Sequence, residues 1–478
     1  MHTLVNNRLH ALIVILLVTM SASSVAQSIV DTAEVHQAGL RVVEITTVNG
    51  EEPQGKAVSH PNGNNFNYIY TNKVPCQIVI TLHHDTLYNS GAYQEGTSGA
   101  TIRINGNTSA YYSNVLNMPY KLKLEKAADL LCRSQEAQYA DKHWRLLKDA
   151  VSLNTIVGLR LSQLVGLEWT ASYTPCNVII NGDYRGCYLL METVKRNNKC
   201  RISVDKQQGY IVERDPYWWK EEHYFATSWY ENANTYRWTW KYPDEEDITT
   251  EKELFIQQCI NLAEQAIRTG GPYERHIDVD SYAKWLLAHD ILGTRDSGGS
   301  NMYVKKYDES DSTLLAMPCL WDFDSSYEMK PDSFSRLHIS ANAYFSTLLK
   351  SSNKTFAKAY VTFWNDLKSG LTDTITSFIH AYMASDEAKA LDASRLLYNR
   401  RFNYAYPSLE YSAQQALQWF STHPSLMDAQ IQCIDTVGTS AIQPVVDNGN
   451  KRQSYYDLLG RRTARPAVLK KAGINVLH

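Results

Sequence analysis

The first third of the chain alternates short runs of β-branched and aromatic residues with turns rich in Asn, Gly and Pro. This alternation is typical of a mostly antiparallel sheet. The predicted strands cover residues 40–47, 76–82, 100–104 and 120–124. A hairpin follows, in which residues 177–180 and 184–191 flank a two-residue Asn181-Gly182 turn. The helical period of hydrophobic positions appears first over residues 140–150 and 152–165.

From about residue 249 the helical period dominates the sequence. The predicted helices cover residues 251–269, 279–292, 341–349, 356–369, 373–382 and 387–402. Strands are predicted between them at residues 302–307 and 314–321. A β-rich lobe over about residues 38–200, followed by an α-rich lobe over about 245–425, predicts an α+β fold with a cleft at the junction. We expect one domain to span residues 27–425.

Both ends of the chain have the composition of targeting segments. Arg8 and His10 precede an apolar run and the small residues Ser24-Val25-Ala26, which predicts a signal peptide over residues 1–26 and a secreted or cell-surface protein. The apolar run has about ten residues, whereas a membrane-spanning helix needs roughly 20. No later stretch reaches that length, so we expect no transmembrane segment.

At the other end, residues 426–453 are predicted to form a polar linker. Residues 454–478 contain the string YYDLLGRR, which resembles the C-terminal sorting tails of type IX secretion cargo. The resemblance implies contact with a secretion machinery. A short β-hairpin without a targeting role is the alternative interpretation.

Composition narrows the classes of partner. A hydrophobic content of 44% is enough for a full core, and the net charge of −3 comes without a Lys/Arg stripe. We therefore expect neither nucleic acid nor an anionic membrane as a partner. The eight Cys residues contain no CxxC pair and no zinc-like spacing.

Two local patterns leave alternatives open. Cys176 and Cys187 are predicted to face each other across the hairpin, either as a disulfide or as two small buried residues; the diverging side chains of a hydrogen-bonded pair favour the second. Residues 209–243 contain five Trp residues, which either bind a peptide or sugar or contribute to the core. Core packing is the more frequent role of such residues.

The segment from Asp296 to Asn301 carries the strongest chemical signal. An Asp and an Asn five residues apart reproduce the spacing of the catalytic loop of protein kinases. In that loop the Asp contacts the acceptor hydroxyl and the Asn holds a metal ion. Gly298 and Gly299 let the loop turn back so that both side chains can face one point, although an ordinary surface turn has a similar composition.

Asp322 and Asp324 follow a predicted strand and are separated by Phe323. Alternation along a strand would direct both carboxylates to one side. Two acids so placed repel each other unless a cation lies between them. The pair therefore predicts a metal site, with a solvated strand end as the alternative.

A phosphate-binding region is predicted upstream. Gly106, Asn107 and Thr108 form a small-residue loop after a strand, and backbone N–H groups of such loops bind phosphate oxygens. On the next strand Lys121 and Lys123 share one face, opposite Leu122 and Leu124. We expect one Lys to face the cleft and favour Lys123.

Several blocks, taken in their order along the chain, resemble the spore-coat protein H (CotH) kinase-like family over roughly residues 38–370. They are the Gly106 loop, the strand with Lys121 and Lys123, the hairpin that ends at Glu192, the loop from Asp296 to Asn301, and the segment with Asp322 and Asp324. The resemblance implies an atypical protein-kinase-like two-lobed fold that transfers phosphate from ATP to Ser residues of exported proteins. It implies Asp296 as catalytic residue, Asn301 and Asp322 as metal ligands, and Asp324 as a further metal or structural candidate. Lys123 would hold the phosphates and Glu192 would lie beside the adenine.

Three functions are compatible with the sequence. The first is a kinase that uses ATP and Mg²⁺, with Mn²⁺ or Ca²⁺ as alternative ions, and acts on Ser or Thr of an exported or surface protein. The second is a catalytically inactive, adhesin-like protein on a kinase-like scaffold. The third is a structural envelope protein whose acidic residues bind Ca²⁺.

Overall fold

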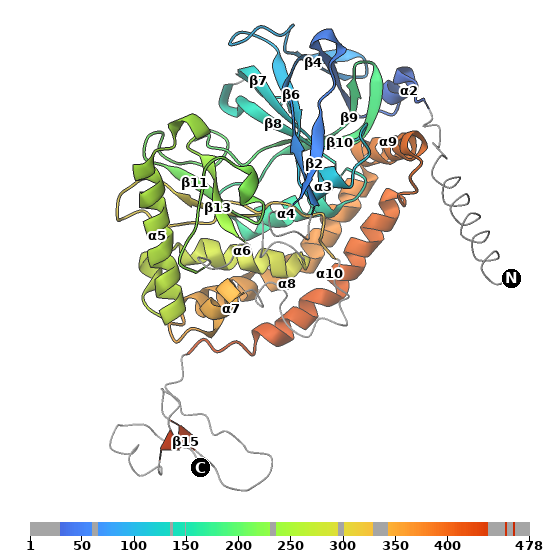
Figure 1. The fold of residues 1–478 in the computed structure, drawn as a ribbon. Coiled ribbons are helices and arrows are strands. Elements are labelled where there is room, and N and C mark those ends of the chain that lie inside the picture. Colours follow the sequence, from blue (N-terminus) through green and yellow to red (C-terminus); the bar gives the residue numbers. More distant parts are fainter. Residues whose placement is uncertain are drawn as a thin grey trace, which may run out of the picture.

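The computed structural model describes residues 29–59, 66–133, 137–148, 150–229, 236–294, 301–327 and 343–437, and two short strands at 455–456 and 462–463. The predicted signal peptide, Asp296 and most of the predicted tail lie outside these residues. In Figure 1 the strands of the first half gather in a barrel and the later helices lie beneath it. None of the described helices combines the length and hydrophobicity that crossing a membrane requires.

The N-terminal strands form one eight-stranded sheet that closes on itself. The strand order is β1 (Arg41–Thr47), β9 (Tyr173–Ile180), β10 (Asp183–Glu192), β8 (Asp141–Leu147), β7 (Tyr120–Ala128), β6 (Ala100–Ile104), β4 (Val74–Leu82) and β5 (Asp85–Asn89). Because β1 also pairs with β4, the sheet becomes a barrel. Alternate residues fill its interior, including Ile78, Ile102, Leu122 and Trp144. A hairpin of β2 (Gly55–Ser59) and β3 (Phe66–Tyr70) and the short helices α2 (Thr32–Gln37) and α3 (Thr108–Tyr111) surround the barrel.

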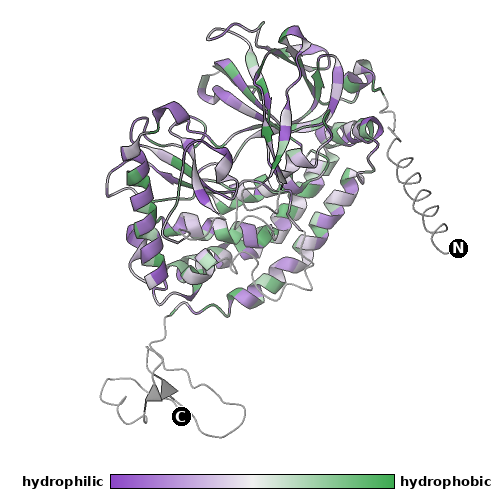
Figure 2. Ribbon diagram, in the orientation of Figure 1, coloured by the Kyte–Doolittle hydropathy of each residue, from purple (hydrophilic) through white to green (hydrophobic). Residues whose placement is uncertain are grey.

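A second sheet and a set of helices make up the rest of the fold. The sheet has the order β12 (Tyr224–Phe225), β13 (Arg237–Tyr242), β11 (Tyr210–Asp215) and β14 (Met302–Lys306). The helices are α4 (Asn154–Val165), α5 (Thr250–Thr269), α6 (Val279–Leu292), α7 (Ala343–Lys350), α8 (Thr355–Ala384), α9 (Asp386–Phe402) and α10 (Leu409–Ile431). Figure 2 shows hydrophobic and polar stripes along these helices.

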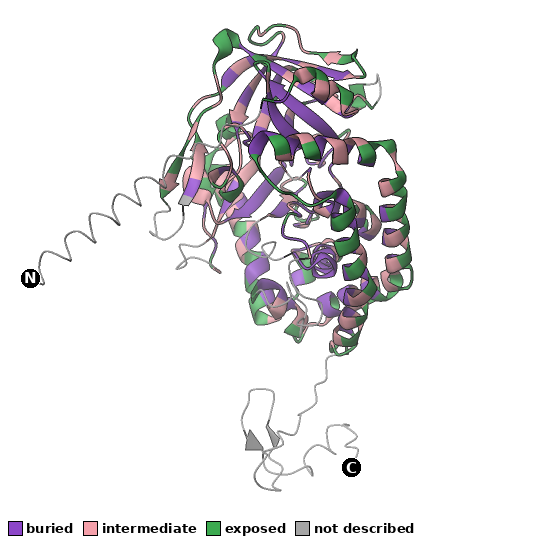
Figure 3. Ribbon diagram, turned by 90° about the vertical axis from the view of Figure 1, so that its right-hand side faces the viewer, coloured by how far each residue is buried: buried purple, intermediate pink, exposed green. Residues whose placement is uncertain are grey.

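One hydrophobic core joins these helices to the outer face of β10 and to the second sheet. Its centre includes α6, whose residues are buried on nearly all sides, and a helix in that position needs no polar face. Figure 3 shows buried residues in the middle of the helical region and exposed ones on the outer helices. Trp238 lies in this core and Trp240 packs against it, so the core interpretation of the Trp-rich segment is confirmed for these two.

The predicted α+β composition is confirmed, with four differences in detail. Residues 140–150 were predicted to be helical, but β8 forms there because Trp144 and Leu146, two residues apart, both point into the barrel. The predicted strand at 314–321 makes only single bridges at Leu315 and Ala316; Pro318, which has no N–H, interrupts it. The two helices predicted between 356 and 382 are one helix, α8, and α10 was not predicted.

The hairpin of β9 and β10 is confirmed, but its register differs from the predicted one. A β-bulge between Tyr184 and Gly186 shifts the pairing, so that Cys187 lies opposite Asn177 and Tyr188 lies opposite Cys176. Cys176 points into the barrel and Cys187 into the other core. The disulfide alternative is therefore wrong, and all eight Cys residues are free thiols.

Free thiols at all eight positions can be counted directly. We expect the protein, unfolded in denaturant without reductant and treated with iodoacetamide, to carry eight alkyl groups by mass spectrometry. Prior treatment with dithiothreitol should leave the mass of the alkylated product unchanged. A gain of two groups after reduction would contradict the structure.

Candidate functional site

Three cationic side chains form a row on the outer face of the barrel. Arg103 of β6 lies directly opposite Lys121 of β7, and Lys121 lies directly opposite Arg145 of β8. Directly opposed residues of neighbouring strands point to the same face. Adjacent strands are about 4.8 Å apart, so the row of Arg103, Lys121 and Arg145, here called the cation row, is about 10 Å long.

The three cations of the row have no ion-pair partner among the described carboxylates, although the charges of Glu221 and Glu245 act on Arg103. Like charges directly opposite each other in a sheet are destabilising, yet no carboxylate in the described ranges forms an ion pair with any of the three. Arg103 instead lies 3.9 Å from the Tyr70 ring centroid and Arg145 lies 5.1 Å from that of Trp321. Burial, together with the charges of Arg103, Arg145 and two nearby Lys residues, holds the pKa of Lys121 well below its usual value. Such a row is suited to binding an anion.

Two acids of β11 are engaged with groups outside the cation row. Glu213 of β11 forms an ion pair of 2.6 Å with Lys241 of β13. Asp215, two residues along the same strand, accepts hydrogen bonds from the Tyr217 backbone N–H at 2.7 Å and from the Thr239 hydroxyl at 3.3 Å. Burial and the charge of Glu213 raise the pKa of Asp215 to about 7. Neither acid forms an ion pair with the cation row.

The predicted phosphate loop lies at the end of β6, next to the cation row. In the orientation of the Asn105 amide that satisfies both donors, its oxygen accepts hydrogen bonds from Arg145 and from the Gly106 backbone N–H, each at 2.9 Å. Gly106 has a φ of +107°, and a Cβ there would lie 2.6 Å from the Ser109 hydroxyl. Asn107 accepts a hydrogen bond from Lys220 of the second sheet region, whereas Thr108 is exposed. The structure thus brings Gly106 and Asn107, with Arg145, into one region.

Asn301 and Asp322 are brought together as predicted. The Asn301 side-chain amide donates a hydrogen bond of 3.1 Å to an oxygen of Asp322, although the residues are 21 positions apart. Their φ angles are +60° and +67°. This left-handed conformation is uncommon for residues other than Gly and is concentrated at functional sites. Carboxylate and amide oxygens are ligands for Mg²⁺ and Ca²⁺.

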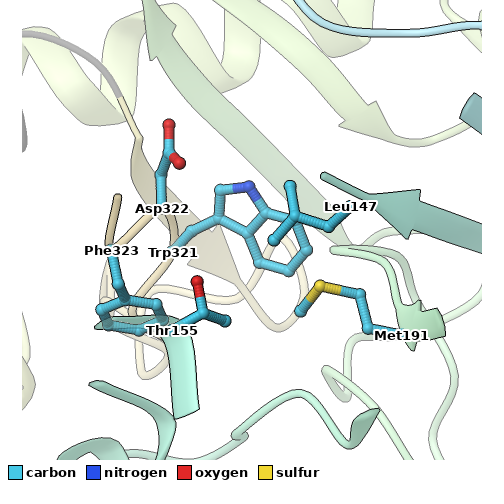
Figure 4. Close-up of a pocket in the computed structure, with 6 residues that line it drawn as sticks. All are labelled: Leu147, Thr155, Met191, Trp321, Asp322 and Phe323. Carbon is cyan, nitrogen blue, oxygen red and sulfur yellow. The ribbon is translucent and has the colours of Figure 1, made fainter. Parts of the chain in front are cut away.

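Buried aromatic residues on either side hold Asp322 in place. Phe323 is packed against α4 at Gly158, where a Cβ would lie 2.3 Å from the ring. Trp321 and Phe323 line a small pocket together with Leu147, Thr155, Met191 and Asp322. Figure 4 shows the indole among the apolar side chains, with the Asp322 carboxylate directed away from them. The pocket adjoins the cation row, because Met191 of β10 lies directly opposite Arg145.

The chain approaches the Asp296 segment from the end of α6. The helix ends at Gly293 with a φ of +60°, and a Cβ there would lie 2.6 Å from the Trp419 ring. One turn earlier, the His289 ring is 2.7 Å from the hydroxyl of buried Thr294. Both ends of the loop are thus fixed, by α6 before it and by Asn301 after it. Asp296 itself lies outside the described residues.

The sequence model of the CotH kinase protein family matches residues 136–389, which is more than half of the 478 residues. The chain belongs to the CotH kinase family. No curated protein matches the sequence. The match includes Arg145, Glu192, Asp296, Asn301 and Asp322, whereas the Gly106 loop, Arg103 and Lys121 precede it.

Within this CotH family member, the two Lys candidates differ in environment. Lys121 and Lys123 share the outer face of β7, as predicted, because Leu122 and Leu124 are buried in the barrel. Lys121 is the one in the cation row, whereas Lys123 is exposed. Lys121 therefore replaces Lys123 as our candidate for phosphate binding.

The other predicted residues lie at the edges of the CotH family site. The carboxylate of buried Glu192 accepts hydrogen bonds of 2.9 Å from Arg133 and from the Ser172 backbone N–H. Met191, the preceding residue, lines the pocket, and neighbouring side chains on a strand point to opposite faces. The structure thus directs the Glu192 side chain away from the pocket. Asp324 is exposed, and in the described part of the chain no three His, Cys, Asp or Glu side chains gather as a metal centre.

Two members of the cation row were missed by reading the sequence of this CotH protein. Arg103 lies in a predicted strand, but the long connection between β6 and β7 leaves their register undetermined by sequence. Arg145 lies in the segment that was predicted to be helical. Recognising a period of two in residues 141–147 would have placed Arg145 on the same outer face as Lys121.

Proposed function

We propose that this CotH family member is an exported atypical kinase that transfers phosphate from ATP, with Mg²⁺, to Ser or Thr of an exported or surface protein. The observation that supports the proposal is the cation row beside the Asn301–Asp322 pair and the apolar pocket. In this proposal the barrel and the helical region act as the small and large lobes of a kinase-like fold.

Each part of the site has a task in phosphoryl transfer. Lys121 and Arg145 would hold the phosphates that are not transferred. Asn301 and Asp322 are the residues that would hold Mg²⁺, because their oxygens suit a hard cation. The bound ion would supply positive charge to the phosphate oxygens. Asp296 would orient the acceptor hydroxyl and take up its proton.

A labelling experiment tests this function. Residues 27–478 are incubated with γ-labelled ATP, Mg²⁺ and casein as a Ser-containing acceptor, beside Asp296→Ala, Asp322→Ala and the exposed-surface control Asp366→Ala. We expect the wild type and Asp366→Ala to label themselves or casein, and the two site variants to fall to background. EDTA should abolish the label incorporation, because removing Mg²⁺ leaves the negative charges of the ATP phosphates without their counter-ion.

Absent label, or equal label in the wild type and both site variants, would contradict the kinase. Thermal stabilisation by Mg-ATP without any label would favour the adhesin-like kinase scaffold instead. Stabilisation by Ca²⁺ alone would favour the structural envelope protein.

A further inference from the structure

We propose that Lys220 is a positioning residue, which holds the Gly106 loop in a fixed place relative to the Asn301–Asp322 pair and thereby supports phosphate binding. This inference rests on the proposed function and adds a residue to its phosphate-binding region. It follows from the hydrogen bonds of the Lys220 ammonium and from the position of Lys220 beside the second sheet.

Lys220 reaches the loop from outside the barrel. It ends the short helix η3 (Trp218–Lys220), which follows β11 of the second sheet. Its ammonium donates hydrogen bonds to the Tyr68 carbonyl at 3.0 Å, to the Asn67 side-chain oxygen at 3.3 Å and to the Asn107 side-chain oxygen. An ammonium has three N–H donors, so the protein itself takes up all of them. Lys220 therefore holds the loop and does not bind phosphate directly.

The Lys220 contact is charged and partly shielded from water. Asn67, one of the three acceptors, is 1% exposed. Burial lowers the pKa of Lys220 to about 8, although the charges of Glu221 and Asp215 act in the opposite direction. The side chain is thus mainly protonated at pH 7. Hydrogen bonds from a charged donor are roughly twice as strong as neutral ones, so the contact is strong enough to fix a loop.

The Gly106 loop is anchored on both sides of the glycine. Before it, the Asn105 amide contacts Arg145 of the cation row. After it, Asn107 is bound by Lys220. Asn107 directly precedes α3, where a side-chain oxygen usually caps the helix, but in the described structure it makes no such bond. The geometry of the loop is therefore set from the second sheet region rather than by α3 alone.

The second sheet also connects Lys220 to the predicted metal ligands. Asn301 directly precedes β14, and β14 pairs with β11 along its whole length. Lys220 follows the last residue of β11 by five positions. Hydrogen-bonded networks and rigid elements of this kind carry coupling between sites. Lys220 thus ties the loop to the element that carries Asn301, and phosphoryl transfer requires both to reach the same phosphates.

Hydrogen exchange without nucleotide tests the contact itself. We expect the backbone amides of residues 105–112 to exchange at least about tenfold faster in Lys220→Met than in the wild type, while those of β7 and β8 stay unchanged. Asn107→Ala removes the same hydrogen bond from its other partner and should have the same effect. The exposed-residue control Lys206→Met should match the wild type. Wild-type exchange of this segment in both Lys220→Met and Asn107→Ala would overturn the inference.

Calorimetric titration of residues 27–478 with ATP tests what the contact does. Lys220→Met and Asn107→Ala should each weaken Mg-ATP binding by about tenfold, and the double variant should be no weaker than the weaker single variant, because both changes remove one contact. The factor by which Mg²⁺ strengthens ATP binding, measured against EDTA, should fall as well, because the loop is no longer aligned with Asn301. A role in stability alone would leave that factor unchanged. Additive losses, or faster exchange with wild-type affinity, would overturn the positioning role.

These outcomes are distinct from those of the proposed function, because neither measurement contains an acceptor. The expected exchange and titration results without label transfer would contradict the kinase and leave the role of Lys220 standing. Label transfer with a Lys220→Met protein that matches the wild type in exchange and affinity would contradict that role and leave the kinase standing. Absence of Mg-ATP binding by the wild type would contradict both.

Discussion

Replacing Lys121 with Met should weaken Mg-ATP binding by about a hundredfold, or about 2.7 kcal/mol, while raising the stability of the free protein. Lys121 lies between Arg103 and Arg145 without an acid partner in the described structure, so removing its charge relieves repulsion, by up to about 1 kcal/mol. The bound phosphates lose a charge-assisted hydrogen bond at the same time. Calorimetric titration and thermal unfolding without nucleotide measure the two effects.

The opposite signs of these effects distinguish a binding residue from a structural one. Lys123→Met makes the same chemical change two residues away on the same face, at an exposed position. We expect its affinity for Mg-ATP to remain within about fivefold of wild type, since an exposed charge near the site contributes at most about 1 kcal/mol. An equal loss of affinity in Lys123→Met, or a Lys121→Met protein that is less stable with unchanged affinity, would contradict the assignment of Lys121.

The order of chemical motifs along the chain was enough to predict part of the site. Asn301 and Asp322 were expected to share a metal site because an Asp-containing loop precedes a strand and a second Asp follows it. Their side chains are joined by a hydrogen bond in the structure. The sequence could indicate this contact because Asn301 directly precedes β14 and Asp322 ends the next apolar segment of the chain.

The cation row could not be predicted, because it depends on register between strands that are distant in sequence. A shift of one residue would turn Lys121 into the barrel. The register of β6, β7 and β8 is fixed by how Ile102, Leu122 and Trp144 pack in the barrel interior. This packing is a property of the whole sheet. The same limit explains Cys176 and Cys187, whose predicted opposition was removed by a single bulged residue in β10.

The position of Asp322 depends on Gly158 in helix α4, whose Asn154 side chain also donates a hydrogen bond of 3.0 Å to the Asp324 backbone carbonyl. Gly usually destabilises a helix interior by about 1 kcal/mol relative to Ala. At Gly158 of α4, however, the space of a side chain is taken by the Phe323 ring, 2.3 Å from where a Cβ would lie. Gly370 of α8 has no such neighbour, because the nearest atom to its Cβ would be 3.9 Å away, on Thr374. The two helices therefore provide a matched pair for the same substitution.

Gly158→Ala should lower the free energy of unfolding by about 2 kcal/mol, since the overpacking cost exceeds the gain in helix propensity. It should also weaken Mg-ATP binding by at least about tenfold, because a displaced Phe323 carries Asp322 away from Asn301. Gly370→Ala should instead stabilise the protein by about 0.5–1 kcal/mol and leave binding unchanged. Denaturant unfolding and calorimetric titration measure both quantities. If both Ala variants were more stable than the wild type and bound Mg-ATP with wild-type affinity, the packing of Phe323 against Gly158 would not determine the position of Asp322. If Phe323→Leu restored stability to Gly158→Ala, the contact between helix and ring would be the cause of its loss.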